Sequence, residues 1–429
     1  MRLSHAVVEM LRPSRPLAVS LPWYREITGR QWRALVAGQF GWALDAFDVM
    51  LYSFCLPVIM KEWGSSPAAA GFMVTVTLLS SALGGIVFGA VADRVGRKRA
   101  LMLTVAMFSI CSGLSGLARD LTELAIARTL LGLGMGGEWA AGALLVGETW
   151  PARHRGKAMG IMQSGWALGY IAAAVAAAVV LPRWGWRVMF FLGVLPALST
   201  LWMRAGIEEP EVWLRARRRP GAAGGLLSIF APDLLRFTVV STLTSACVMF
   251  GYWGLFSWMP GFLAMPVAEG GAGLGIARAP VWVIPMMVGA FFGYLSFGFI
   301  ADRIGRRPAF AAFLLIAAVL TRVLGGTRDP AMLMALGPLI GFFGSGYFSA
   351  FGAFIAELFP TRVRGAAVGF CYNAGRMLSA LAPTVIGHLA SRHGVGGALG
   401  FLAFAFVAGA GAIYLLPETR GRELGEGPA

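Results

Sequence analysis

Charged residues are scarce in this 429-residue chain: Asp, Glu, Lys and Arg together make up 13% of it, whereas 57% is hydrophobic. So little charge excludes a single soluble core as the destination of all this apolar sequence. Cysteine is also rare, and Cys55, Cys111, Cys247 and Cys371 all fall inside apolar stretches. That placement indicates packing residues and argues against a disulfide framework or a metal site. No nucleophile–base arrangement is visible in the sequence either, so we expect neither an enzyme nor a cofactor.

The apolar residues gather into twelve long runs. A helix needs about 20 mostly apolar residues to cross a hydrocarbon layer about 30 Å thick. The runs are continuously apolar and do not alternate, which favours helices over the strands of a barrel. The sequence therefore predicts an all-α membrane protein with twelve transmembrane helices. Their expected ranges are 34–57, 68–91, 101–118, 122–148, 158–181, 187–205, 238–263, 280–300, 309–325, 331–357, 366–390 and 396–416.

The 36 Lys and Arg residues are distributed unevenly between the loops. Most of them fall in cytoplasmic segments if the N-terminus is inside, as the positive-inside rule requires. We therefore expect an integral protein of the plasma or inner membrane with both termini in the cytoplasm and no removable signal peptide. The formal charge of +15 is explained by this orientation and by a basic face that meets anionic lipid, so it requires no nucleic-acid partner.

Two loop motifs repeat at one offset. "ADRVGRK" at 92–98 returns as "ADRIGRR" at 301–307, and "GETWPARHRG" at 147–156 returns as "AELFPTRVRG" at 356–365, each 209 residues later. The chain is therefore expected to hold two six-helix bundles related by a pseudo-two-fold axis along the membrane normal. The expected segments are an N-terminal segment 1–33, a first bundle 34–205, a linker 206–237, a second bundle 238–416 and a tail 417–429.

These motifs also carry a family resemblance. "GAVADRVGRKRAL" resembles the loop signature of the major facilitator superfamily, and "RTLLGLGMGGEW" resembles its fourth-helix motif. More narrowly, "LDAFD", "GLGMGGEW", "GYWGLFSWMP" and "YNAGRMLSALAP" are similar to the proton symporters of organic acids, which include lactate, sialate, aromatic-acid and dicarboxylate permeases. The resemblance covers nearly the whole chain. It implies a secondary transporter that works by alternating access, and it favours a monomer.

Three acids and one cation lie inside the spans of the first half. Asp45 and Asp48, three residues apart, share one helix face, and Arg128 in the fourth span reaches a similar depth to Asp48. A charge at mid-membrane costs at least about 2.5–3.5 kcal/mol, so these groups indicate partners or a watery cavity, although a purely structural pair is the alternative. The resemblance implies that Asp48 pairs with Arg128, and we expect Asp48 to load a proton that Arg128 displaces. Glu138 is either a second proton site or a bridge to Asp45 through a shared proton.

Arg376 lies in the middle of the eleventh span, and the second half offers no deep acid to pair with it. A guanidinium forms a planar fork that suits a carboxylate, so the missing partner is either the substrate or, alternatively, Asp45 or Glu138 across the cleft. Asn373, three residues earlier, is placed to add a hydrogen bond to a bound substrate. Six more residues are candidates for the cavity wall; the alternative for each is a role in helix packing or as an anchor at the membrane interface. They are Gln163, Trp166, Tyr252, Trp253, Tyr347 and Tyr372.

The repeated loops combine an acid with several cations at the cytoplasmic face. An acid there can sit at a helix N-terminus, where the helix dipole favours negative charge, while the arginines reach other carboxylates. The resemblance implies a gate that holds the inner side shut while the outer side is open; the alternative is a solvated loop. The first copy comprises Asp93, Arg94, Arg97 and Glu148, and the second comprises Asp302, Arg303, Arg306 and Glu357.

The expected function is proton-coupled uptake of a small organic anion, a monocarboxylate, by a membrane transporter without a metal. Three alternatives remain open: symport of a zwitterionic osmolyte, symport of a dicarboxylate, or proton-driven export of drugs or metabolites. Export is disfavoured because the fifth span, "SGWALGYIAAA", lacks the glycine-proline signature usual in drug antiporters.

Overall fold

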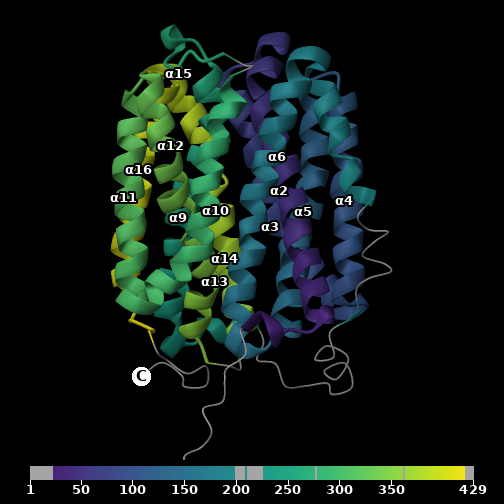
Figure 1. The fold of residues 1–429 in the computed structure, drawn as a ribbon, viewed down its shortest axis with the longest axis vertical. Helices are drawn as coiled ribbons and strands as arrows, with labels where there is room; N and C mark the ends of the chain where they lie inside the picture. Colours follow the sequence, from purple (N-terminus) through teal and green to yellow (C-terminus); the bar gives the residue numbers. More distant parts are fainter. Residues whose placement is uncertain (1–22, 199–207, 210–225, 276–277, 361–362, 421–429) are drawn as a thin grey trace, which may run out of the picture.

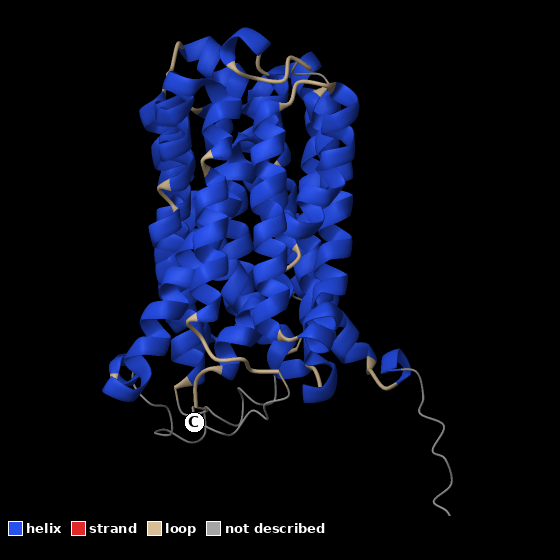
Figure 2. Cartoon of the chain, turned by 90° about the vertical axis from the view of Figure 1, so that its left-hand side faces the viewer, coloured by secondary structure: helices blue, strands red, loops and turns tan. Residues whose placement is uncertain are grey.

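The computed structural model describes residues 23–198, 208–209, 226–275, 278–360 and 363–420. In these ranges the long helices run side by side along the long axis of the molecule (Figure 1, Figure 2). The first half contains η1 (Trp23–Arg25), α2 (Gly29–Trp63), α3 (Pro67–Val95), α4 (Arg97–Leu117), α5 (Leu121–Thr149), α6 (Ala152–Leu192) and η2 (Leu195–Leu198). The second half contains η3 (Leu226–Phe230), α9 (Pro232–Ala264), η4 (Val267–Glu269), α10 (Ala279–Ile304), α11 (Arg306–Gly326), α12 (Pro330–Ser345), α13 (Phe348–Glu357), α14 (Arg364–Ser379), α15 (Ala382–Gly400) and α16 (Leu402–Tyr414).

Two helices each hold parts of two membrane passes. Eight described helices are long and apolar enough to cross a membrane, and a bent pair, Ala366–Gly400 with Leu402–Tyr414, makes a ninth. Breaks at Gly185 (φ 76°) in α6 and Gly394 (φ 71°) in α15 separate the fifth pass from the sixth and the eleventh from the twelfth. α5 provides the fourth pass. The predicted order of the twelve helices is therefore confirmed. The predicted end of the sixth span, 199–205, lies outside the described residues.

The offset of 209 residues returns in the backbone. Gly185 and Gly394, which break α6 and α15, are 209 residues apart, and both adopt positive φ values that suit glycine. Asp120 caps the start of α5 and Asp329 caps the start of α12, again 209 residues apart. Each carboxylate accepts hydrogen bonds from backbone N–H groups of the first turn, which otherwise have no partner in the helix. The repeat in the loop motifs is therefore also a repeat of structure.

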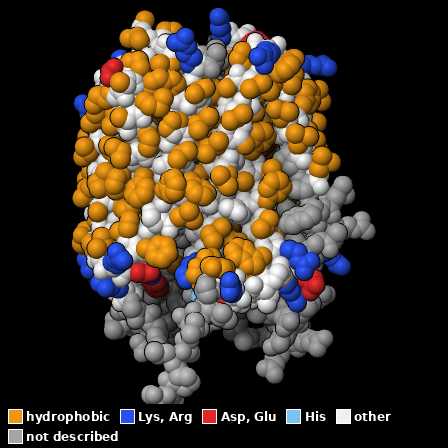
Figure 3. Space-filling view, viewed as in Figure 1, with side chains coloured by type: hydrophobic (Ala, Val, Ile, Leu, Met, Phe, Trp, Pro, Cys, Tyr) orange, Lys and Arg blue, Asp and Glu red, His pale blue; other side chains and the backbone are white. Residues whose placement is uncertain are grey.

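The outer surface of the bundle is apolar around its middle. Figure 3 shows hydrophobic side chains over most of the height of the visible face, with Lys, Arg, Asp and Glu gathered at the two ends. Large apolar side chains such as Phe292 and Phe404 are exposed on the molecule. An apolar belt of this kind suits acyl chains, and its charged ends suit lipid headgroups and water. The chain is a multi-pass integral membrane protein.

Glycines bring the helices of each bundle into backbone contact. A Cβ atom on Gly136 of α5 would lie 1.7 Å from the carbonyl oxygen of Ser81 on α3, and one on Gly341 of α12 would lie 1.7 Å from that of Met286 on α10. Only glycine permits so close an approach, which is typical of membrane helix interfaces. The glycines of the "GLGMGG" motif therefore serve helix packing.

The two bundles meet mainly along two helix pairs, α3 with α15 and α6 with α10. At the end of the molecule opposite the start of α2, a Cβ on Gly71 would lie 2.4 Å from the carbonyl oxygen of Pro383. A Cβ on Gly387 would lie 2.5 Å from the carbonyl oxygen of Pro67 at the start of α3. The Thr75 hydroxyl donates a 2.6 Å hydrogen bond to the Ala380 carbonyl. We call this contact of Gly71, Thr75, Pro383 and Gly387 the α3–α15 seam. It joins the two bundles at this end of the molecule.

Candidate functional site

A small cavity lies between the two bundles. Its volume is about 20 Å³, which is room for a single water molecule. Both halves of the chain contribute to its wall. The lining residues are Trp42 from α2, Gln163 and Trp166 from α6, Met249, Tyr252 and Trp253 from α9, Tyr294 from α10, Phe348 from α13, and Tyr372 and Arg376 from α14.

Aromatic rings surround one guanidinium in this cavity. Trp166 of the first bundle meets Trp253 of the second edge-to-face, with ring centroids 5.6 Å apart, and Tyr252 meets Phe348 at 5.0 Å. The guanidinium carbon of Arg376 lies 6.0 Å from the Trp253 centroid, at the limit of a cation–π contact. Arg376 is buried, and within the described residues its guanidinium forms no ion pair and no hydrogen bond. Its donors are therefore available to a ligand.

Six of the eight predicted substrate-binding residues line the cavity, and two do not. Asn373 was expected beside Arg376, but its side-chain amide donates to the Gly369 carbonyl of its own helix at 2.9 Å and its oxygen packs against Gly85 of α3. Asn373 precedes Arg376 by three residues on α14. The rotation of the helix over these three positions is enough to turn the Asn373 side chain from the cavity toward α3. Tyr347 was expected in the wall as well. It lies fully buried at the break between α12 and α13, where its ring packs on Phe348, so Phe348 reaches the cavity in its place.

Four lining residues were missed from the sequence: Trp42, Met249, Tyr294 and Phe348. Trp42 lies three residues before Asp45, and Met249 lies three before Tyr252, so the helical period alone places them on faces already identified. Tyr294 and Phe348 are aromatic residues within apolar spans, where nothing in the sequence distinguishes a cavity wall from ordinary packing.

The intramembrane acids are buried inside the first bundle and do not face lipid. Asp45, Asp48 and Glu138 are fully buried, and Arg128 is almost so. Asp45 lies within electrostatic range of Glu138, Asp48 and Arg128 in its own bundle and of Arg376 in the other. No salt bridge joins these five groups in the described part of the chain, which leaves them separated but mutually coupled.

Glu138 packs directly on α2, one turn from Asp45. A Cβ on Gly41 would lie 2.3 Å from Glu138 Oε1, so glycine at this position makes room for the carboxyl group. Among the described residues, neither the Glu138 oxygens nor the Asp45 oxygens have a hydrogen-bond partner. Two neighbouring buried carboxyl groups without donors cannot both carry a charge cheaply. This arrangement is compatible with both expected roles of Glu138.

The expected salt bridge between Asp48 and Arg128 is not formed in this conformation. Asp48 Oδ1 accepts a hydrogen bond from the Ser112 hydroxyl of α4. The guanidinium of Arg128 lies over the rings of Tyr52 and Phe190, 5.1 Å and 5.9 Å from their centroids, within electrostatic range of Asp48. In place of a salt bridge, the guanidinium contacts two aromatic faces and the carboxyl group contacts the serine hydroxyl.

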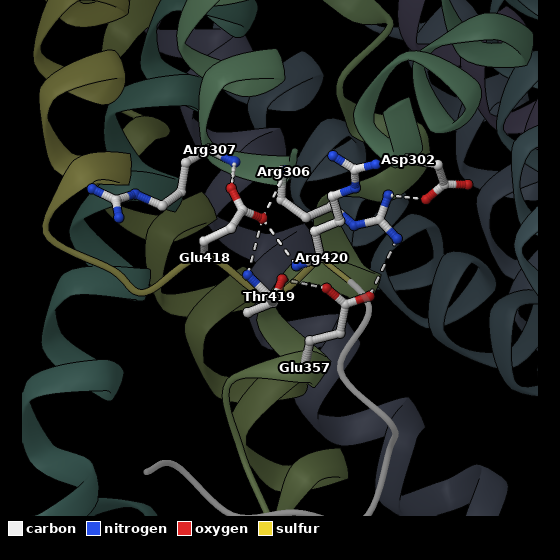
Figure 4. Close-up of polar contacts among 7 residues, drawn as sticks. All are labelled: Asp302, Arg306, Arg307, Glu357, Glu418, Thr419 and Arg420. Carbon is white, nitrogen blue, oxygen red and sulfur yellow. Dashed lines mark hydrogen bonds and ion pairs between the residues drawn. The ribbon is translucent and has the colours of Figure 1, made fainter. Parts of the chain in front are cut away.

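The second copy of the repeated loop forms the predicted network in part (Figure 4). Arg306 pairs with Asp302 at 2.6 Å and with Glu357 at 3.4 Å. The Thr419 hydroxyl donates to the other Glu357 oxygen at 2.5 Å. Arg303, which was expected in this gate, is exposed and joins none of the ion pairs seen among the described residues. The side chains of the first copy, Asp93, Arg94, Arg97 and Glu148, lie outside the described residues.

A glutamate after each bundle caps a helix next to the repeated loop. Glu418 accepts hydrogen bonds from the backbone N–H groups of Arg306 and Arg307 at 2.8 and 3.0 Å (Figure 4). Glu209 accepts a hydrogen bond from the backbone N–H of Lys98 at 3.3 Å. The two glutamates are 209 residues apart. Burial alone would raise the pKa of Glu418, but its backbone N–H donors outweigh burial and hold this pKa below its ordinary value. Sequence reasoning missed both caps, although the offset connects them.

Comparison with known proteins places the chain in one family. The model of the Major Facilitator Superfamily matches residues 40–296 and 281–429. The chain is 37% identical over 406 residues to a "Probable 4-methylmuconolactone transporter" of Cupriavidus pinatubonensis, covering 93% of each chain. It is 31% identical over 366 residues to a cis,cis-muconate transport protein of Acinetobacter baylyi, covering 84% of this chain and 87% of the relative. The solved structure of a D-xylose-proton symporter has the same fold, with a TM-score of 0.74 at 20% identity over 92% of this chain and 100% of the symporter.

These matches extend over both bundles, and the proteins concerned are transporters and not enzymes. The twelve-pass helical architecture and the 209-residue repeat agree with them. The protein is a transporter of the Major Facilitator Superfamily.

Proposed function

We propose that this protein takes up a small organic anion, a monocarboxylate, together with protons by alternating access. One observation carries the proposal: the cavity between the bundles holds a single guanidinium, Arg376, which has free donors and lies within electrostatic range of the membrane-embedded acid Asp45. A carboxylate bound to Arg376 meets a planar fork that can donate two parallel hydrogen bonds. Arg376 is the one cation in the described cavity wall, which favours a monocarboxylate over a dicarboxylate.

The aromatic wall suggests the shape of the anion. Trp166 and Trp253 present ring faces and edges from opposite bundles, and such surfaces favour a flat, unsaturated or aromatic body. The substrates named for the two relatives, 4-methylmuconolactone and cis,cis-muconate, are small unsaturated organic acids or their lactones. We therefore place the substrate of this protein among the small planar carboxylates.

The conformation described here suits an occluded stage of the cycle. A cavity of about 20 Å³ is too small for a six-membered ring, so the bundles must part before a substrate enters. The α3–α15 seam would then be the outer gate. The network of Asp302, Arg306 and Glu357 would stabilise the inner face, with the termini in the cytoplasm and the protein acting as a monomer.

Proton coupling is assigned to the buried charges of the first bundle. Asp48 binds a proton when Arg128 is withdrawn, and Arg128 displaces that proton when it returns, which links protonation to the conformational cycle. Asp45 and Glu138 form a second pair of acids. Through Asp45 this pair is coupled electrostatically both to Asp48 and Arg128 and to Arg376.

The test begins with binding. Purified protein is screened for thermal stabilisation by benzoate, nicotinate, lactate, 4-methylmuconolactone, cis,cis-muconate, sialate and betaine. We expect a monocarboxylate to stabilise most, and we expect Arg376→Ala to abolish both this stabilisation and uptake in correctly inserted protein. Stabilisation by betaine alone would support the zwitterion alternative, and stabilisation by muconate alone would support a dicarboxylate. Full uptake by Arg376→Ala would overturn the assignment of the substrate site.

A further inference from the structure

Ser112 occupies an unusual position beside Asp48. It lies on α4, is fully buried, and its single hydroxyl hydrogen faces two acceptors. One is Asp48 Oδ1 on α2, and the other is the Phe190 carbonyl oxygen at 3.2 Å in α6, after the break at Gly185. A hydroxyl can donate only one hydrogen bond at a time, but it can accept others. Ser112 can therefore direct its hydrogen to either acceptor.

Glycine at position 193 leaves room for the contact between Ser112 and Asp48. A Cβ on Gly193, at the end of α6, would lie 2.1 Å from Ser112 Oγ and 2.3 Å from Asp48 Oδ1. Any larger residue at this position would separate the hydroxyl from the carboxyl group. The other carboxyl oxygen, Asp48 Oδ2, is buried without a hydrogen-bond partner in the described part of the chain. Ser112 therefore holds the carboxyl group through Oδ1 alone.

Few charged or titratable groups face Asp48. Arg128 approaches from α5 and the Cys111 thiol from α4, while Asp45 and Tyr52 are neighbours on α2 itself. The segment after Gly185 contributes the Phe190 carbonyl and the Gly193 backbone, neither of which titrates. When Arg128 lies over its aromatic rings, Ser112 is the one side chain seen to hydrogen-bond to Asp48 in the described residues.

We propose that Ser112 is a positioning residue that keeps Asp48 hydrogen-bonded in both of its protonation states. This inference rests on the proton-coupled function proposed above. With Asp48 ionised, the Ser112 hydroxyl donates to Oδ1. When a proton binds Oδ1, the new O–H donates to Ser112 Oγ, and the hydroxyl hydrogen of Ser112 turns from Oδ1 to the Phe190 carbonyl. The O–H bond of the carboxyl group is the one covalent bond formed, and each of the two hydroxyl hydrogens has an acceptor.

Removing the hydroxyl affects the two states unequally. A hydrogen bond to a charged carboxylate is roughly twice as strong as one between neutral groups, so the ionised state loses more. In Ser112→Ala, we therefore expect proton binding at Asp48 to occur at a pH about one unit higher, which is about a tenfold change in the equilibrium.

The experiment follows the proton and needs no substrate. Infrared difference spectra of purified protein are recorded across a pH series, and the band of the protonated Asp48 carboxyl group is identified by its loss in Asp48→Asn. We expect this band to titrate about one pH unit higher in Ser112→Ala and to move to a higher frequency, because its hydrogen bond is lost. Ser112→Cys retains a weaker donor of similar size and should shift the titration less, in the same direction.

Ser109→Ala is the matched control, because Ser109 lies one turn earlier on α4, is equally buried and has no hydrogen-bond partner among the described residues. It should leave both the midpoint and the frequency unchanged. An Asp48 band that stays in place in Ser112→Ala would overturn this inference even if proton-driven uptake is observed. Uptake that is independent of pH, with the band shifted as expected, would instead contradict the proposed function and leave the role of Ser112 standing.

Discussion

Replacing Arg376 with lysine keeps the positive charge in the cavity and removes the planar fork. In the described structure Arg376 is 2% exposed and its guanidinium makes no ion pair, so its donors are uncommitted until an anion arrives. A carboxylate can take two parallel hydrogen bonds from arginine, whereas a lysine ammonium offers a point charge with one such bond in line. A hydrogen bond to a charged group contributes about 1.5–3 kcal/mol. The expected loss of affinity is therefore about 10- to 150-fold.

The assay is the concentration dependence of thermal stabilisation by the acid that binds wild-type protein best. Arg322→Lys provides a matched control, because Arg322 is an exposed arginine on α11, away from the cavity, and this substitution should change nothing. Unchanged affinity in Arg376→Lys would refute the reasoning, since it would mean that the fork is not what the substrate contacts. A loss in both variants would point to a general effect on stability.

Three further outcomes are expected. Asp48→Asn should exchange labelled substrate across proteoliposomes yet fail to accumulate it when the exterior is acid; accumulation equal to wild type would remove Asp48 from the coupling step. Gly71→Ala should retain substrate-induced stabilisation but lose most of its uptake, because the added Cβ would meet the Pro383 carbonyl in the α3–α15 seam; normal uptake would show that the seam is not a moving contact. Glu418→Gln should lower stability by about 1 kcal/mol at neutral pH, as the loss of a helix cap does. Because the pKa of Glu418 is lowered in the folded protein, its contribution is complete above the unfolded value and disappears as pH falls through the folded value. A stability difference that does not change across an acid titration would contradict this assignment.

Much of the fold could be predicted from the sequence, because a lipid environment imposes simple rules. Apolar runs must be helices, and two loop motifs at one offset must reflect a repeated bundle. For the same reason, the charges that the membrane disfavours, Asp45, Asp48, Glu138 and Arg376, could be identified as buried and inward-facing. Each is a charged residue within an apolar run, so the sequence alone identifies it.

The remaining features depend on rotations and backbone contacts that composition does not reveal. Asn373 was assigned to the cavity from its spacing to Arg376, but a rotation of three helical positions turned it toward α3. Tyr347 was a candidate among the aromatic residues of its span, but it lies at the break between α12 and α13. Ser112 carried no signal, because serines are common in membrane helices and most bond to their own backbone. Glu418 acts through backbone N–H groups, so no partner residue in the sequence announces its role.

The most direct test of the central claim records protons and substrate together. Proteoliposomes with a neutral interior, an acid exterior and no membrane potential carry an internal pH dye, and the stabilising acid is added outside. The account predicts that the lumen acidifies faster than in protein-free liposomes or liposomes with Arg376→Ala, while the substrate rises inside above its external concentration. Protein-dependent entry of the substrate that stops at equal concentrations, with no protein-dependent change in internal pH, would contradict it.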